Sequence, residues 1–189
     1  MSEQKVKGTM LLDFVKMIRK NKQLNWNQYL KPSDWSIINS NVLPGVWYPA
    51  DIYARCSMAT FHLMGKGRLE SARGNGQMIA AHMFESTYKS LLQSKDPVKG
   101  LNQFVFIFGS LFNFTLLKVK SLEPGHARFS HLSAFEEKPV VIDKPAFAYQ
   151  LLGFLETVVA MTGGKKITAT IVSKEWEGAP ATIFDITWD

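Results

Sequence analysis

The side chains that could carry chemistry are few and scattered along the chain. The 189 residues include one cysteine, Cys56, and four histidines, His62, His82, His126 and His131. Cys56 lies on the apolar stripe of a predicted helix, which is typical of a buried, inert thiol. His126 and His131 are close in sequence, but a separation of five residues along one strand places them on opposite faces. We therefore expect no metal site.

The same inventory argues against covalent catalysis. An activated nucleophile needs a base beside it, and the sequence shows neither a base paired with Cys56 nor a Gly-x-Ser-x-Gly turn. We accordingly assign no catalytic residues and expect the chain not to be an enzyme.

A glycine-rich stretch offers a candidate anion site. Gly65 and Gly67, then Gly74 and Gly76, precede a predicted helix. Three cations, Lys66, Arg68 and Arg73, lie among these glycines. Backbone amides at a helix start, together with such cations, can hold phosphate. The stretch lacks the spacing of a Walker or Rossmann motif, so a flexible loop between two helices is the plainer interpretation.

Composition narrows the class of protein. The chain is 46% hydrophobic and 12% aromatic, which excludes global disorder. Its longest apolar run, 101–119, is interrupted by polar residues, so we expect no transmembrane segment. The early Glu3 and the single cysteine favour a cytoplasmic protein. The net charge of +6 comes without a nucleic-acid-binding motif, and we expect no nucleic-acid partner.

Apolar spacing predicts helices through the first half of the chain. The pattern gives a helix over 9–20, a short piece around Trp26 that Pro32 ends, and another piece carrying Trp35. Trp47-Tyr48-Pro49 leads into a helix that ends at Gly65. Two more helices are predicted, over about 75–93 and from Asp96-Pro97 through Phe108.

In the second half of the chain the spacing of apolar residues changes to that of strands. Alternation predicts strands over 114–120, 126–132, 166–173 and 182–188, and a long helix runs from Pro145 to Gly163-Gly164. This predicts a single α+β domain over 1–189, with N-terminal helices packed on a C-terminal antiparallel sheet, a meander of about four strands. We expect residues 1–6 to be flexible.

This layout resembles a known grouping of proteins. Lys7-Gly8 before a Phe-Val helix, the early Trp26, and Trp47-Tyr48-Pro49 before a helix resemble the start of heme–nitric-oxide-binding (H-NOX) domains. The helix through Gly153–Glu156, Gly163-Gly164, the turn at Gly178 and the last strand resemble the end of 4-vinyl reductase and TRAPP-like ligand-binding domains. Over 6–189 the order of features is most similar to an uncharacterised family described mainly from myxobacteria.

The resemblance implies an α+β fold with a small-molecule pocket and frequent homodimerisation, but no reaction. Candidate residues for an apolar pocket are Trp47, Tyr48, Phe104, Phe108 and Phe112, which can equally fill a core. The TRAPP group further implies that Cys56 is open to acylation.

Heme is the ligand that H-NOX domains imply, held by a proximal histidine on a helix and a later Tyr-x-Ser-x-Arg motif. The corresponding stretch here, 101–117, contains no histidine, and the later motif is absent. We therefore expect no cofactor. The sequence favours a non-catalytic cytoplasmic regulatory or adaptor module that signals by binding a protein partner or an apolar small molecule. The alternative is a sensor based on heme or another cofactor.

Overall fold

In the computed structural model, which describes residues 3–86, 88–89, 94–131 and 143–189, the helices and the strands of the C-terminal sheet follow the predicted order, whereas two short strands in the N-terminal half were not predicted. The helices are α1 (Thr9–Lys20), α2 (Pro32–Ile38), α3 (Ala50–Leu63), α4 (Leu69–Glu85), α5 (Pro97–Ser110) and α6 (Lys144–Met161), with short 3-10 turns η1 (Trp26–Gln28) and η3 (Glu175–Glu177). The strands are β1 (Lys5–Lys7), β2 (Trp47–Pro49), β3 (Leu117–Glu123), β4 (His126–His131), β5 (Thr168–Ser173) and β6 (Thr182–Thr187). Parts of two predicted elements, 87 and 90–93 in a helix and Leu132 in a strand, lie outside the described residues.

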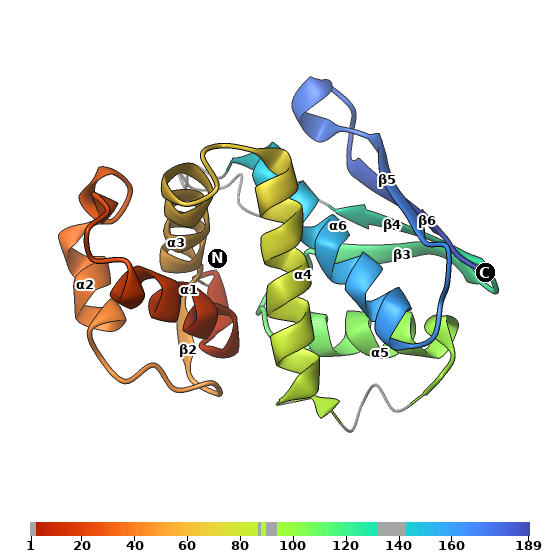
Figure 1. Cartoon of the computed structure of the whole chain (residues 1–189), viewed down its shortest axis with the longest axis horizontal. Helices are drawn as coiled ribbons and strands as arrows, with labels where there is room; N and C mark the ends of the chain where they lie inside the picture. The colour runs from red at the N-terminus through yellow and green to blue at the C-terminus, as the bar shows by residue number, and fades with distance from the viewer. Residues whose placement is uncertain (1–2, 87, 90–93, 132–142) are drawn as a thin grey trace.

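The C-terminal sheet confirms the α+β prediction but not the meander. Its four antiparallel strands lie in the order β3-β4-β6-β5, so β6 is inserted between β4 and β5. The chain leaves the sheet after β4, forms α6, and returns at the far edge as β5 before the hairpin brings β6 back inside. Phe129 and Phe184, paired across β4 and β6, are fully buried, and α6 lies over one face of this sheet (Figure 1).

The N-terminal segment contains a short strand. Lys5–Lys7 forms β1, which pairs antiparallel with β2, and the side chain of Val6 is 0% exposed. The predicted flexibility of residues 1–6 stays a prediction, but the strand at Lys5 and Val6 was not foreseen. Pro32 was also misassigned: it begins α2 rather than ending a helix, because a proline in the first helical turn loses no hydrogen bond.

A buried ion pair joins α2 to α3. Arg55 donates two hydrogen bonds of 2.7 Å to the carboxylate of Asp34, whose residue is 2% exposed. Asp34 also accepts from the backbone N–H of Lys31, and Arg55 lies 3.6 Å from Asp51. The hydrogen bonds to Asp34 raise the pKa of Arg55. This network fixes the N-terminal helices to one another.

The backbones of α4 and α6 touch through two glycines. A Cβ placed on Gly76 would lie 2.0 Å from the Gln150 carbonyl oxygen, and one on Gly153 would lie 2.1 Å from that of Arg73. One turn of α6, 150–153, is thereby held against α4, which stands between the N-terminal helices and the α6–sheet layer (Figure 1). Within the described ranges, no helix is long and apolar enough to cross a bilayer.

The glycine contact predicts a sharp contrast within one helix. Gly76→Ala and Gly153→Ala should each destabilise the protein by about 1–3 kcal/mol, the usual cost of overpacking. Gly74→Ala is the control, because its Cβ would meet nothing within 4 Å. It should stabilise the protein by about 0.4–1 kcal/mol. Urea denaturation monitored by circular dichroism measures all three, and equal effects of Gly74→Ala and Gly76→Ala would contradict the close contact.

Candidate functional site

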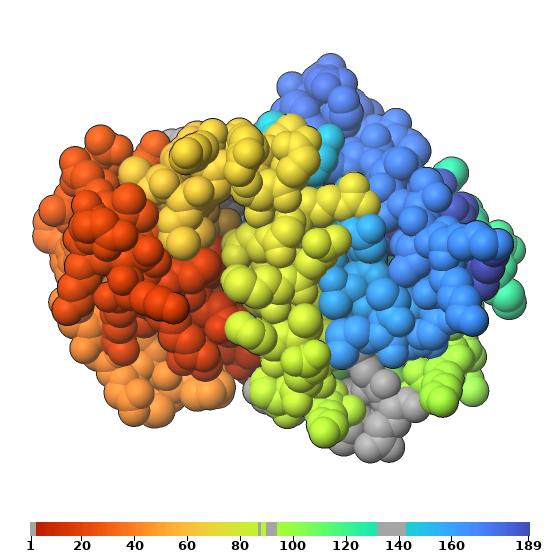
Figure 2. Space-filling view, viewed as in Figure 1, coloured from red at the N-terminus to blue at the C-terminus, as the bar shows by residue number. Residues whose placement is uncertain are grey.

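Two clefts flank α4 where it meets the N-terminal helices. α4 separates those helices from α6 on the face shown in Figure 2. The first, which we call the polar cleft, has a volume of ≈ 330 Å³ and lies between α1 and α4. The second, which we call the methionine cleft, has a volume of ≈ 260 Å³ and lies among α1, α3, α4 and α6.

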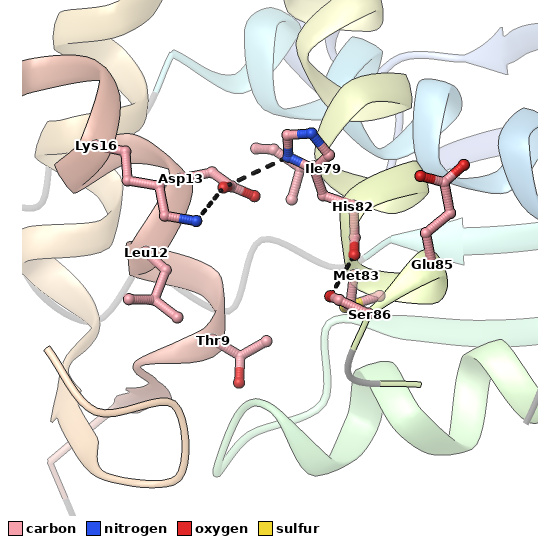
Figure 3. A pocket seen from close by; sticks show the side chains of 9 residues that line it. All are labelled: Thr9, Leu12, Asp13, Lys16, Ile79, His82, Met83, Glu85 and Ser86. Atoms are coloured by element: carbon pink, nitrogen blue, oxygen red, sulfur yellow. Dashed lines mark hydrogen bonds and ion pairs between the residues drawn. The ribbon is translucent and has the colours of Figure 1, made fainter. Parts of the chain in front are cut away.

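The polar cleft contains an aspartate, a histidine and a serine, the residue types of many hydrolase sites, but they are not arranged as in such a site. Asp13 lies 3.5 Å from Lys16 and 3.6 Å from the Nδ1 atom of His82 (Figure 3). Ser86 lies one turn beyond His82, but its hydroxyl donates to the His82 backbone carbonyl rather than to the imidazole. The hydrogen bond that would activate a serine nucleophile is therefore not made in this structure. Thr9, Leu12, Ile79, Met83 and Glu85 complete the lining.

The methionine cleft is lined by apolar and uncharged polar side chains. Its members are Met17, Ser57, Thr60, Phe61, Met64, Gly65, Ser71, Ala72, Gly74, Asn75, Met78, Ala146 and Gln150. Met64 and Met78 are each 38% exposed, which is unusual for methionine. The cleft is suited to an apolar molecule, because methionine side chains adapt to irregular shapes.

Gln150 is the most deeply buried polar residue that lines the methionine cleft. The residue is 2% exposed, and its Oε1 atom accepts a 3.1 Å hydrogen bond from the Ser57 hydroxyl. Its Nε2 atom is buried and makes no hydrogen bond of acceptable geometry. The amide lies beside the hydroxyl of Tyr53, whose pKa burial raises well above its ordinary value. An amide nitrogen carries two N–H groups, and Tyr53 could accept at most one.

Sequence reasoning missed Gln150, although a signal was present. The residue falls three positions after Phe147 and four before Phe154, both buried core residues of α6. A polar side chain at such spacing must face the same side of the helix as its apolar neighbours. An amide on an apolar face requires hydrogen-bond partners, and this requirement marks it as a candidate site residue.

Cys56 matches the prediction of an inert thiol. It is fully buried on α3, and burial raises its pKa to about 12. The neutral thiol is a poor nucleophile. Acylation of Cys56 stays a prediction without structural support.

The five residues predicted to line an apolar pocket do not form one together. Trp47 is largely exposed, with the Lys7 ammonium 5.3 Å from its ring centroid. The Tyr48 hydroxyl accepts a hydrogen bond from the Leu43 N–H. Phe104 is core, whereas Phe108 and Phe112 belong both to the core and to a surface cleft of ≈ 270 Å³ after α5. That cleft is lined by Val105, Phe108, Gly109, Phe112, Asn113, Phe114, Thr115, Leu116 and Leu117.

The predicted anion site falls mostly on a helix. The flexible loop expected over 65–76 is wrong beyond Arg68, because α4 begins at Leu69 and contains Gly74 and Gly76. Arg73 donates two hydrogen bonds, of 2.9 and 3.0 Å, to Glu156 on α6. Its charge is therefore already neutralised. Lys66 and Arg68 precede the helix, and anion binding there stays a prediction.

The inward face of α5 does not fit the heme ligation that the resemblance implies, which leaves His62 or His82 as an iron ligand only in a different arrangement. The inward face of α5, where the resemblance expects a proximal histidine, carries Leu101, Phe104 and Phe108. The rings of Phe104 and Phe108 lie 5.2 Å apart, and 6.1 and 5.9 Å respectively from that of Phe154 on α6. Phe84 and Phe112 extend this aromatic cluster. The space between α5 and α6 is thus occupied by side chains.

Truncating the aromatic cluster should be costly. Phe154 is 1% exposed, and we predict that Phe154→Ala lowers the free energy of unfolding by about 3–5 kcal/mol. Phe106 on α5 is 79% exposed, so Phe106→Ala should change it by less than about 0.5 kcal/mol. A denaturant melt provides both values, and a loss below 1 kcal/mol for Phe154→Ala would rule out the packed cluster.

The two histidines of β4 lie on opposite faces of the sheet, as predicted. His126 is on the outer face, where its Nε2 atom lies 3.0 Å from Asp185, and Arg128 also donates to that carboxylate. His131 is buried, with Nδ1 2.8 Å from the Leu116 carbonyl oxygen and its ring 5.2 Å from that of Phe147. Within the described ranges, no cluster of potential metal ligands is found.

The pKa values of His126 and His131 should be shifted in opposite directions from the ordinary value of histidine. The hydrogen bond to Asp185 raises the pKa of His126 above 6.5, whereas burial lowers that of His131 below 6.5. Because the unfolded chain takes up a proton at His131 first, this residue should lower stability as the pH falls through 6.5. An NMR titration of the imidazole signals checks both shifts. Asp185→Asn should lower the pKa of His126 only, and an equal change at His131 would contradict the assignment.

Comparison with known proteins identifies the fold. No family model and no curated protein matches the chain. A mutant H-NOX protein from K. algicida in the Fe(II) unliganded state matches with a TM-score of 0.63 and 13% identity, over 97% of this chain and 96% of that one.

Two further solved structures agree with this match. A mutant of the T. tengcongensis H-NOX matches with a TM-score of 0.61 and 16% identity, over 97% of both chains. An H-NOX protein from S. oneidensis in the Fe(II)NO ligation state gives 0.62 and 11%, over 97% of this chain and 99% of that one. Another match comes from a study of heme distortion in the H-NOX family. The chain has the α+β fold of the H-NOX proteins along nearly its whole length.

Proposed function

We propose that this protein is a non-catalytic sensor module that responds to a bound small molecule. The observation that carries the proposal is the match to H-NOX structures over 97% of the chain. Those proteins are described by the state of a bound iron or by the ligation of nitric oxide. A fold shared from end to end favours a ligand-binding sensor over an adaptor that acts only through its surface.

The arrangement of the clefts supports this proposal. Both lie along α4, at the junction of the N-terminal helices with the rest of the molecule. A molecule bound in either cleft contacts elements on both sides of that junction. Such contacts allow a ligand to favour one relative position of the two sides over another.

A heme-based sensor is the second candidate, favoured by the heme proteins that share the fold. Two observations oppose it. The aromatic cluster occupies the space between α5 and α6, and the described residues place no histidine on the inward face of α5. We therefore propose a sensor whose ligand is not heme.

The cytoplasmic location of the protein is part of the proposal, supported by the single buried cysteine. Homodimerisation and a protein partner stay predictions.

Native mass spectrometry of the protein purified from its own host tests the proposal. We expect the 21.3 kDa chain, or a multiple of it, to carry a non-heme small-molecule adduct that collisional activation removes. A heme adduct would replace the proposal with the heme-based sensor. A bare chain would overturn it in favour of the adaptor. Adding hemin to the purified protein is the matching control, and no saturable one-to-one absorbance change is expected.

A further inference from the structure

The ligand class follows from the lining of the methionine cleft. We infer that this cleft binds an uncharged, mainly apolar molecule of fragment size that carries one hydrogen-bond acceptor. The inference rests on the proposed sensor function and names its site. Three kinds of observation carry it: the absence of charge in the lining, the apolar side chains at the mouth, and the unsatisfied amide of Gln150.

The lining selects against charged molecules. The residues that line the cleft include no aspartate, glutamate, lysine or arginine. An ion that left water for this site would meet no counter-charge, and the desolvation cost would be unopposed. Met17, Met64 and Met78 instead offer polarisable apolar contacts, with Phe61 and Ala72 behind them. The polar cleft differs in that Lys16, Asp13 and Glu85 line it.

The buried amide calls for an acceptor. Gln150 Nε2 has two N–H groups, of which Tyr53 could take at most one, so one donor is left unsatisfied. An unmet buried donor destabilises the protein, and a ligand carbonyl or hydroxyl oxygen would relieve this by accepting its hydrogen bond. Asn75, on the α4 wall, also has a side-chain amide without a hydrogen bond in the described part of the chain. Both residues line the same cleft.

The size of the cleft limits the ligand. Its volume of ≈ 260 Å³ is below the ~300–1,000 Å³ of pockets for drug-sized molecules. A single aromatic ring with a short substituent is of suitable size. Because the walls come from α1, α3, α4 and α6, such a molecule would touch both sides of the junction that the proposed sensor reads.

Three probes of nearly equal shape test the ligand class. Acetophenone is uncharged and has one acceptor, α-methylstyrene replaces that oxygen with a CH2 group, and benzoate carries a charge. Each is titrated into ¹⁵N-labelled protein, with the side-chain NH2 signals of Gln150 and Asn75 as reporters. We expect acetophenone to bind about tenfold more tightly than α-methylstyrene, which corresponds to one satisfied hydrogen bond. Benzoate should bind most weakly.

Matched variants test the location. Met78→Glu places a charge at the mouth of the cleft and should weaken acetophenone binding at least tenfold. Met161→Glu is the control, because Met161 is also 38% exposed but lies outside the lining. Met64→Glu serves as the second mouth variant if Met78→Glu unfolds. Gln150→Leu should bring the affinity for acetophenone down to that for α-methylstyrene.

Several outcomes would overturn the inference. These are tightest binding by benzoate, an equal effect of Met161→Glu, and no shift of the Gln150 or Asn75 signals with any probe up to millimolar concentration. The native adduct tests the proposed function independently of these probe titrations. If the Met78→Glu variant still carries the native adduct, the protein is a sensor but its ligand binds outside the methionine cleft. If the wild-type chain carries no adduct, the proposed sensor function is wrong.

Discussion

The backbone contact between α4 and α6 is the constraint on which the rest of the structure depends. Gly76 and Gly153 let the two helices approach until an added Cβ would overlap a carbonyl group of the facing helix. The paired hydrogen bonds from Arg73 to Glu156 hold the same crossing from its edge. Because α6 also covers the sheet, this one crossing sets the distance from α4 to the sheet. It also fixes Gln150, whose carbonyl lies against Gly76 and which lines the methionine cleft.

The N-terminal helices are held by different interactions. Asp34 and Arg55 join α2 to α3 through a buried ion pair, and Phe14 of α1 packs edge-on against Tyr53 of α3. Breaking such a pair on one side leaves an uncompensated buried charge, so the arrangement within these helices is strongly determined. The clefts lie where this group of helices meets α4. One hydrophobic core nevertheless runs through both parts, since Tyr53 of α3 also contacts Phe112 and Phe147.

Much of the fold could be predicted from sequence, and the failures share a cause. Apolar periodicity and caps located α1, α5 and α6 to within a few residues, because these signals are local. Gly74 and Gly76 were misread as loop residues, since glycine marks both a flexible turn and a close helix contact, and only the partner helix decides between them. The strand order was missed for the same reason, because alternation does not specify which strand lies beside which. Among the site residues, Phe104 was predicted equally well as core or as pocket, and packing against Phe154 assigns it to the core.

The residues that determine the fold of this protein differ from those that determine which ligand fits inside it. The crossing of α4 and α6 rests on glycines and on an ion pair at the helix surface, none of which contributes side-chain volume to the space between α5 and α6. That space is governed by the inward side chains of α5 and α6, here Phe104, Phe108 and Phe154. Large aromatic rings at these positions fill it without altering the helix crossing. The architecture shared with H-NOX proteins therefore does not by itself require a heme site, and two of the three clefts described above lie where the N-terminal helices meet α4.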